Sequence, residues 1–283
     1  MAATRPHAAR ALPALELEAA PLSRRRLLSD LWGYRAILLE LAKVDFRLRY
    51  KRAAFGLMWA VGLPLLQAAV LAIVFSRAIR LSPHLSHAYA VYILSGVLAW
   101  NYLALTVSSS STAIVDASDL TSKLWFPRSV LPLVPVLSNL PGLLISMIIL
   151  LILTPLLGVP PTAHLLLLVP GVSLLVTFSA VLSLVLAALH VYFRDTRYFV
   201  QASLLLLFYA TPILYPPRLL KEVRWVFVLN PFTGIIATFH AATVGDDGEL
   251  FHALTVTLAV LVLLVVIFVE VYRRHDRLFA DRL

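Results

Sequence analysis

Hydroxyl and imidazole side chains are the first groups in this sequence that could take part in nucleophilic or metal chemistry. Ser108–Ser111 and Thr112 form a run of hydroxyls at the end of an apolar stretch, and His84 and His87 stand three residues apart. A serine nucleophile needs a neighbouring base, and no paired Lys or His stands near the run. A metal at the two histidines needs a third ligand, and none is close in the sequence. Both patterns fit helix packing and interfacial positions better than catalysis.

The carboxylates and glycines likewise show no pattern typical of a catalytic or nucleotide-binding site. All 15 Asp and Glu residues lie in tails, loops or at the ends of apolar stretches, whereas ion-coupled carriers usually keep an ionisable group near the membrane centre. None of the ten glycines precedes Lys, so the chain lacks the phosphate-binding loop of P-loop ATPases. The absence of cysteine excludes thiol chemistry and disulfides. We therefore expect a chain that is no enzyme and holds no catalytic residue, cofactor or metal of its own.

These few polar groups are carried by long stretches without charge. Residues 129–193 contain no Asp, Glu, Lys or Arg over 65 positions, and one membrane-spanning helix needs about 20 apolar residues. The whole chain is 60% hydrophobic and 14% charged, against about 25% charged in soluble domains. Because the stretches are long and rich in Leu and Val rather than short and alternating, they favour helices over a barrel. The predicted fold class is an all-α integral membrane protein.

Six spans and both termini in the cytoplasm are predicted. Residues 1–28 are expected to form a disordered cytoplasmic tail, and residues 29–283 one transmembrane domain. With this orientation 19 of the 24 Lys and Arg residues lie inside, as the positive-inside rule requires. The net charge of +9 then reflects topology and contact with anionic membrane lipids, with no nucleic acid as partner. The spans cover about 54–76, 89–112, 131–155, 163–189, 199–215 and 251–271.

Two segments outside the spans carry their own patterns. Residues 30–50 place apolar side chains at helical spacing with charged ones on much of the other face, which predicts an amphipathic helix in the membrane interface. This helix is either a plain juxtamembrane anchor or also the docking site of a partner subunit. Residues 216–250 mix apolar and turn residues, which predicts re-entrant or interfacial helices on the outer side of the membrane.

The loop over residues 116–128 is the most specific cytoplasmic segment. It is short and of mixed charge, and Trp125 and Phe126 precede Pro127. Large aromatic side chains in such a loop are costly unless they are buried against something. They either anchor the loop in the membrane interface, as Trp commonly does, or belong to a helix that inserts into a partner protein.

In four segments the sequence resembles the membrane subunits of ABC-2 type exporters for polysaccharides and lipid-linked glycans, such as O-antigen and teichoic acid permeases. Their order, their spacing and the six-span topology agree over about residues 30–283, while the Ala- and Pro-rich first 28 residues lie outside the resemblance. The matching segments are Asp45–Arg52 with Phe55–Ala60 and Pro64, Lys123–Arg128 with Leu131 and Pro132, Phe193–Arg197 with Ala210–Tyr215, and Leu229–Phe232.

The resemblance implies a homodimer of this chain with two copies of an ABC ATP-binding subunit, in a bacterial cytoplasmic membrane. MgATP is then bound by the partner, and the substrate is a lipid-linked polysaccharide. In such exporters the amphipathic helix and the loop after the second span contact the ATPase. Here that implies contacts from Asp30, Arg35, Asp116, Asp119, Lys123, Trp125, Phe126 and Arg128.

Two further hypotheses concern the cargo. Basic side chains at the end of the amphipathic helix are suited to a pyrophosphate headgroup; they are Arg47, Arg49, Lys51 and Arg52. Aromatic side chains could stack on sugar faces along a channel, or they could equally belong to the core or the lipid-facing belt. These candidates are Trp59, Tyr89, Tyr92, Trp100, Tyr102, Tyr209 and Tyr215.

Two other functions stay open on the sequence. One is an ABC-2 permease for a smaller drug or lipid cargo. The other is an ATP-independent carrier or membrane enzyme acting on lipid-linked sugars, against which the missing mid-span carboxylates and the missing nucleophile–base pair weigh.

Overall fold

The computed structural model describes residues 32–51, 58–78, 83–117, 127–217, 224–246, 248 and 250–275. The expected tail over residues 1–28 lies outside them. In this part of the chain every regular element is a helix. In chain order these are α2 (Arg35–Tyr50), α3 (Met58–Ala78), α4 (Pro83–Ser111), α5 (Ala113–Asp116), η1 (Arg128–Val130), α7 (Leu133–Leu156), η2 (Ala163–Leu167), α8 (Leu168–Tyr192), α9 (Thr196–Ala210), α10 (Arg224–Leu229), α11 (Thr233–Val244) and α12 (Leu250–His275).

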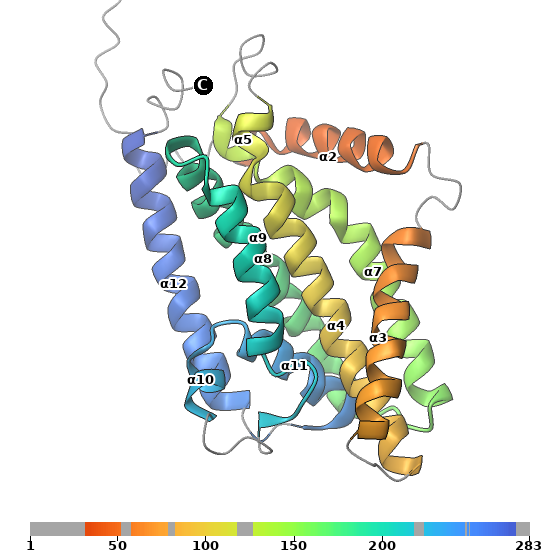
Figure 1. Cartoon of the computed structure of the whole chain (residues 1–283). Coiled ribbons are helices and arrows are strands. Elements are labelled where there is room, and N and C mark those ends of the chain that lie inside the picture. The colour runs from red at the N-terminus through yellow and green to blue at the C-terminus, as the bar shows by residue number, and fades with distance from the viewer. Residues whose placement is uncertain are drawn as a thin grey trace, which may run out of the picture.

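Five helical stretches are long and apolar enough to cross a membrane, and they coincide with five of the six expected spans. Their long helices run side by side along one axis, while α2 lies across one end of the bundle (Figure 1). We call this the α2 end and the opposite one the α11 end. The prediction of an all-helical, multi-pass membrane protein is confirmed by these stretches, which are Met58–Arg77, Ala88–Ser111, Arg128–Leu156, Ala163–Tyr192 and Leu250–Arg273.

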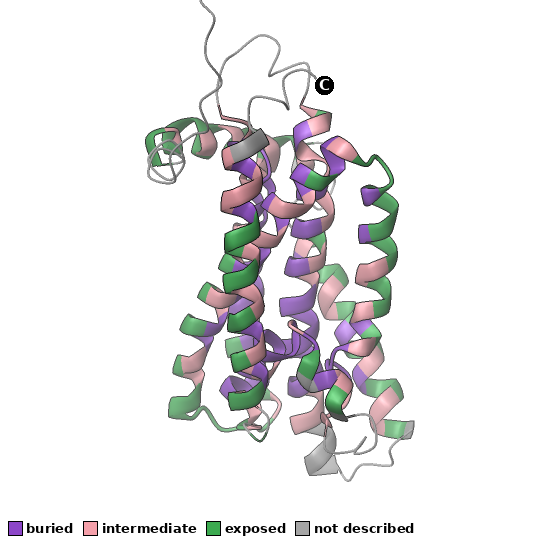
Figure 2. Cartoon of the chain, turned by 90° about the vertical axis from the view of Figure 1, so that its left-hand side faces the viewer, coloured by how far each residue is buried: buried purple, intermediate pink, exposed green. Residues whose placement is uncertain are grey.

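The helix α4 forms the centre of the bundle. In its apolar stretch 78% of the residues are buried, against 17% in α3 and 11% in α12. The Trp100 ring of α4 packs edge-on against Phe208 of α9 and against Phe232. Buried residues lie mainly on the inner sides of the helices and exposed ones on the outer sides (Figure 2). Outward apolar side chains on α3 and α12 cost little in a bilayer, because lipid tails are as apolar as they are.

The predicted helical span over residues 199–215 is wrong in its second part. The helix α9 ends at Ala210, and its 15 residues cover about 22 Å, less than the roughly 30 Å of a bilayer core. Thr211 has extended backbone angles, φ −96° and ψ 139°, as expected for a residue before proline, here Pro212. The chain therefore leaves the helix inside the bundle and continues through an irregular segment over residues 211–217.

Residues 216–250, for which the sequence predicts re-entrant or interfacial helices, include two short helices at the α11 end, α10 and α11. Of these, α11 is almost wholly enclosed, with Ile235, Phe239 and Ala242 each at 0% exposure. It crosses α12 very closely, because a Cβ added at Gly234 would lie 2.6 Å from the carbonyl oxygen of Ala253. Glycine is needed at this crossing since no side chain fits between the two backbones.

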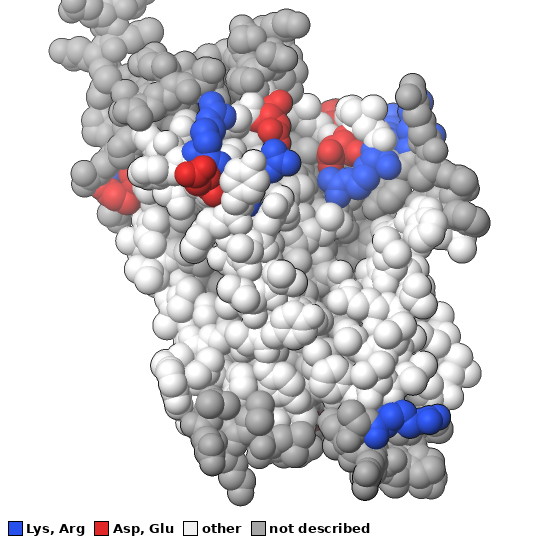
Figure 3. All heavy atoms as spheres, in the orientation of Figure 1, with Lys and Arg blue, Asp and Glu red and all other residues white. Residues whose placement is uncertain are grey.

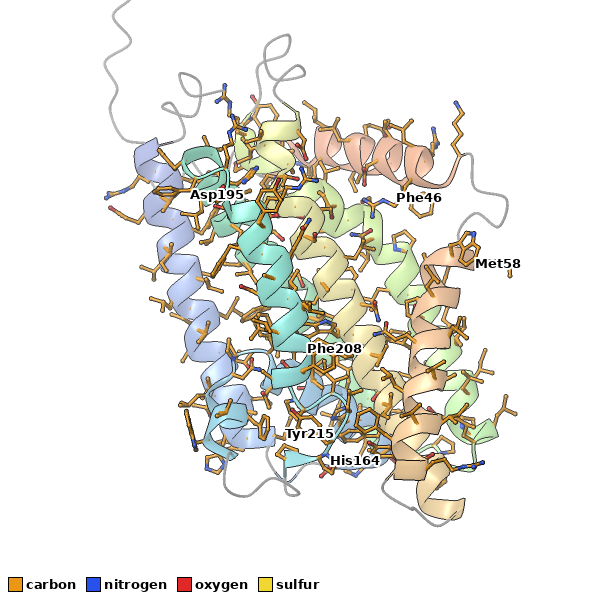
Figure 4. The ribbon with its side chains drawn as sticks, in the orientation of Figure 1. Phe46, Met58, His164, Asp195, Phe208 and Tyr215 are labelled. Carbon is orange, nitrogen blue, oxygen red and sulfur yellow. The ribbon has the colours of Figure 1, made fainter. Side chains whose placement is uncertain are left out.

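The charged side chains mark the two ends of the bundle. Lys, Arg, Asp and Glu gather at the α2 end, above a broad band without charge (Figure 3). Asp195 lies at the α2 end and Tyr215 at the α11 end (Figure 4). The uncharged band matches the part of a membrane protein that faces hydrocarbon, where an ionised side chain is costly.

Candidate functional site

The helix α2 presents two different surfaces. Its inward surface packs on α7 and includes Ala42, which is 6% exposed. Asp45 and Arg49 follow on the same surface at intervals of three and four residues, and both are partly buried. Ile37 and Leu48, which belong to the apolar side chains at helical spacing, are exposed, at 42% and 68%. The helix thus packs on the bundle through a surface that combines apolar side chains such as Leu38 with the charged Asp45 and Arg49, while another part of its apolar surface stays exposed.

A polar network holds α2 against the transmembrane helices. The guanidinium of Arg49 donates to Oδ2 of Asp45 at 2.9 Å and to Oδ1 of Asn139 on α7 at 2.5 Å. Ser138, also on α7, donates to the same carboxylate oxygen of Asp45 at 2.5 Å. Nδ2 of Asn139 then donates to Oγ1 of Thr106 on α4 at 3.2 Å. The network therefore joins three helices, α2, α7 and the central helix α4.

Sequence reasoning did not single out Ser138, Asn139 or Thr106. The signal that could have found them is an Asn in an otherwise apolar span, since an amide in hydrocarbon requires a partner. Asn139 is 5% exposed, and both ends of its amide are paired. Its partner Arg49 lies 90 positions away in the sequence, which is why no local pattern shows the pair.

The residues predicted to contact an ATPase lie at the α2 end where the structure describes them. Arg35 is exposed; it donates to the carbonyl oxygen of Trp32 at 2.9 Å and lies over the Trp32 ring at 5.0 Å. Asp116 accepts from Thr112 at 2.6 Å, and Arg128 begins η1. The other five predicted contacts fall outside the described residues; they are Asp30, Asp119, Lys123, Trp125 and Phe126.

The four predicted headgroup residues divide into different environments. Arg47 and Lys51 are exposed on α2 and just after it. Arg49 is partly buried, and two of its N–H groups are engaged within the protein. Arg52 lies outside the described residues. Among the three described residues, Arg47 and Lys51 are therefore exposed at the surface, whereas Arg49 is engaged within the protein.

The seven aromatic candidates also divide. Tyr92, Trp100 and Tyr102 are enclosed by this chain's own helices, at 4–5% exposure. Trp59 and Tyr209 are on the surface, at 49% and 59% exposure. Tyr92, Trp100 and Tyr102 thus pack the core of this chain, and Trp59 and Tyr209 lie on its surface.

The remaining two candidates, Tyr89 and Tyr215, stabilise the break after α9. The hydroxyl of Tyr89 donates to the carbonyl oxygen of Leu214, and that of Tyr92 to the carbonyl oxygen of Pro212 at 3.2 Å. The hydroxyl of Tyr215 donates to the carbonyl oxygen of Tyr209. Carbonyl groups that leave a helix inside a membrane protein must find donors, and these tyrosines supply them.

No group of three or more His, Asp or Glu side chains that could hold a metal ion occurs in the described ranges. The described features at the α2 end are thus the polar network that joins α2, α7 and α4 and a basic corner formed by the exposed Arg47 and Lys51.

Comparison with known proteins agrees with this arrangement. Residues 38–243 match the ABC-2 type transporter family. A protein of Myxococcus xanthus named O-antigen export system permease protein RfbA is 31% identical over 220 residues, which cover 76% of this chain and 83% of the relative. A protein of the same name from Klebsiella pneumoniae is 27% identical over 206 residues, covering 72% and 78%.

The match runs from α2 to the end of α11 and includes the network of Asp45, Arg49 and Asn139 as well as the broken end of α9. With its helical membrane fold, the chain belongs to the ABC-2 type transporter family of membrane proteins.

Proposed function

We propose that this chain is the membrane subunit of an ATP-driven exporter that carries a lipid-linked polysaccharide of the O-antigen type outward through a homodimer. The α2 end faces the cytoplasm, and the membrane is the bacterial cytoplasmic membrane. The relatives named O-antigen export permeases support the cargo class. ATP is hydrolysed by two copies of a separate ABC subunit that dock at the α2 end.

The observation that carries the proposal is the joint formed by Asp45, Arg49 and Asn139. A subunit bound to the exposed surface of α2 has a direct mechanical connection to α7, and through Thr106 to α4. ATP binding that favours one position of the partner dimer shifts the transmembrane helices only through a contact that differs between the two states. The contact that differs is then the one between the partner and α2, and the joint carries its effect onward to α7 through hydrogen-bonded charged groups.

The first step of export concerns the cargo headgroup. Arg47, Lys51 and Arg52 attract a pyrophosphate at the cytoplasmic surface, because arginine and lysine bind phosphate through charge-assisted hydrogen bonds. The glycan then passes along the surface between two copies, where the exposed rings of Trp59 and Tyr209 stack on sugar faces. The broken helix end and α11 close the outer side.

Purification of the full chain from its native host tests the proposal. We expect a stoichiometric ATP-binding subunit with vanadate-sensitive ATPase activity in the same sample, and loss of surface glycan when the gene is deleted. Arg35→Glu at the α2 end should lower the recovery of the ATPase. Arg77→Glu, the matched charge reversal at the α11 end, should leave it unchanged. A chain recovered with no ATPase would refute the coupling, and an intact surface glycan after deletion would refute the cargo.

A further inference from the structure

The helix α12 is held to the rest of the chain near its two ends. It runs along the bundle from the α11 end, beside α10, to the α2 end (Figure 1). Two of its described residues are buried near its start and two near its end; they are Ala253, Thr257, Phe268 and Tyr272. The residues between these pairs are exposed or partly buried, and Val262 is 64% exposed. The helix thus has two separate attachments.

The first attachment fixes the start of α12 to α11 and to the turn before it. Oγ1 of Thr257 donates to the carbonyl oxygen of Pro231 at 2.7 Å. Near Ala253 the two helices are so close that Gly234 leaves no room for a Cβ. The neighbouring Asn230 is hydrogen-bonded to the end of α9. A movement of α12 at this attachment therefore reaches both α11 and the broken end of α9.

The second attachment fixes the end of α12 at the α2 end of the bundle. Tyr272 is 0% exposed, and its hydroxyl donates to the carbonyl oxygen of Leu184 on α8 at 3.1 Å. Its ring lies against that of Phe268, with the centroids 5.0 Å apart. Both rings belong to a hydrophobic cluster that we call the α2-end cluster. Its buried members include Ile114, Val130, Leu131, Val191, Phe268 and Tyr272.

The α2-end cluster also contains residues next to the predicted ATPase contacts. Ile114 of α5 and Val130 of η1 are both 0% exposed. Ile114 stands two positions before Asp116, and Val130 two positions after Arg128. Because protein interiors are close-packed, neighbouring buried side chains move together. A subunit that displaces Asp116 or Arg128 therefore also displaces the cluster that holds the end of α12.

The helix α12 is suited to carry this displacement along the bundle. Its 26 residues include no proline or glycine, the residues at which helices commonly kink. Thr257 and Phe268 are eleven positions apart, which is about three turns and ~16 Å. The two attachments therefore lie on the same face of one stiff helix. Between them, Val260, Leu261 and Leu264 are only partly buried against the core, so the contact there is looser than at the two ends.

We propose that α12 transmits the state of the docked ATPase from the α2-end cluster to α11, and that Tyr272 is the residue that positions α12 for this movement. The inference rests on the proposed function, since it requires an ATPase at the α2 end. Two routes then begin at the same docking surface. The joint of Asp45, Arg49 and Asn139 leads to α7 and α4, whereas α12 leads to the α11 end. Closely packed helices that move as units are a common means of such switching.

The test measures a distance at the α11 end in the complex of the full chain with its ATPase. The chain has no cysteine, so Phe251→Cys on α12 and Leu156→Cys on α7 supply two thiols for nitroxide labels. Both native side chains are exposed, at 79% and 74%. Labelled chain is diluted with unlabelled chain so that distances within one copy dominate. Electron paramagnetic resonance compares the complex without nucleotide and after trapping with ATP and vanadate, and we expect trapping to shift the distance.

Variants at the two attachments should remove this shift in the labelled chain. Tyr272→Ala removes the ring from the α2-end cluster and should abolish the shift, while the ATPase still copurifies and hydrolyses ATP. Tyr272→Phe keeps the ring in place and should retain the shift. Thr257→Val removes the donor to Pro231 at the opposite attachment with little change of shape and should reduce the shift. Tyr198→Ala is the matched control at the α2 end, because Tyr198 is 68% exposed, and should retain the shift.

The possible failures are distinguishable. An unchanged shift in both Tyr272→Ala and Thr257→Val would overturn the inference, and so would a distance that does not respond to trapping although the bound ATPase is active. Loss of the ATPase from the Tyr272→Ala complex would make Tyr272 a support of the docking surface instead, and Thr257→Val would then decide the role of α12. A preparation without any ATPase would refute the proposed function itself, and this result is seen before a distance is measured.

Discussion

The Nδ2 atom of Asn230 lies 2.9 Å from Oγ1 of Thr211, and this hydrogen bond ties the segment before α11 to the end of α9. The same atom lies 3.2 Å from the carbonyl oxygen of Ala210, while Oδ1 of Asn230 accepts from the backbone N–H of Phe232 at 3.0 Å. Asn230 is 7% exposed, so water cannot replace its side chain. The Asn230 amide thus supplies hydrogen-bond partners both to the end of α9 and to the turn before α11.

Replacing Asn230 with Ala should lower the free energy of unfolding by about 1–3 kcal/mol, because buried polar groups lose their partner. Thermal unfolding in detergent, followed by intrinsic fluorescence, measures the change. Ser173→Ala is the control, since Ser173 is exposed and donates only to its own helix at Val169. If both variants unfold at the same temperature, the amide does not stabilise the break.

The hydrogen bond between Arg49 and Asn139 in the joint should give a measurable coupling energy in a double-mutant cycle. Arg49→Gln and Asn139→Leu each break the 2.5 Å bond between their side chains. A double-mutant cycle on thermal unfolding is expected to give about 1 kcal/mol, since Arg49 is still partly exposed. Lys43→Gln on the same helix removes only the exposed pair with Glu40 and should change little. A cycle that closes to zero would mean that α2 is held by packing alone.

The close crossing of α11 and α12 predicts a strong effect of one methyl group. In Gly234→Ala the new Cβ would lie 2.3 Å from Oγ1 of Thr257, and overpacking of this kind costs about 1–3 kcal/mol. Gly62→Ala on α3 meets nothing within 4 Å and should be neutral or stabilising, because alanine favours a helix over glycine. Thermal unfolding of both variants measures the difference, and equal midpoints would show that the crossing can relax.

Substitutions of His240 on α11 and Gly96 on α4 should lower the thermal stability of the chain by less than the sum of their separate effects. A Cβ at Gly96 would lie 2.8 Å from Nε2 of His240, and the His240 ring stacks on Tyr92 with centroids 3.5 Å apart. Gly96→Ala and His240→Ala should each destabilise the chain, but the double variant should lose less than the sum because the second change removes the clash. Additive losses in thermal unfolding would contradict the contact.

One acid on α2 should titrate below its ordinary range. The hydrogen bond from Nζ of Lys43 at 2.7 Å, and then the charge of that ammonium group, lower the pKa of the Glu40 carboxyl. A lowered pKa in the folded state means that the pair stabilises α2 above the ordinary Glu range and is lost as the pH falls through the lowered value. Carbon-13 NMR of labelled Glu should show this shift, and Lys43→Gln should return the pKa toward its ordinary value. An unchanged pKa in that variant would rule out the pair as the cause.

Much of the fold follows from the sequence. The stretch without charge over residues 129–193, the turn within it and the position of the basic residues predict the spans that α3, α4, α7, α8 and α12 form. Periodicity over residues 30–50 predicts α2 as a helix apart from the bundle. These features are local, because a spanning helix satisfies its own backbone hydrogen bonds and needs only enough apolar residues.

The predictions that failed or stayed incomplete depend on contacts between distant segments. The end of α9 at Ala210 follows from Pro212 in part, but an interior break is possible only because Asn230 and two tyrosines from α4 satisfy its carbonyl groups. Likewise, the apolar pattern of α2 does not show that Asp45 and Arg49 face α7, since their partners Ser138 and Asn139 lie 93 and 90 positions further along the chain.

The sequence alone determined that this is a helical membrane protein with a further amphipathic helix, because hydrocarbon tolerates few charges and the chain displays where they are missing. Only the tertiary structure decided which polar groups are joined, where the fifth expected span breaks and which aromatic rings reach the surface. The physical reason is that burial of a hydrogen-bonding group is a pairwise condition, and each partner here comes from a different helix.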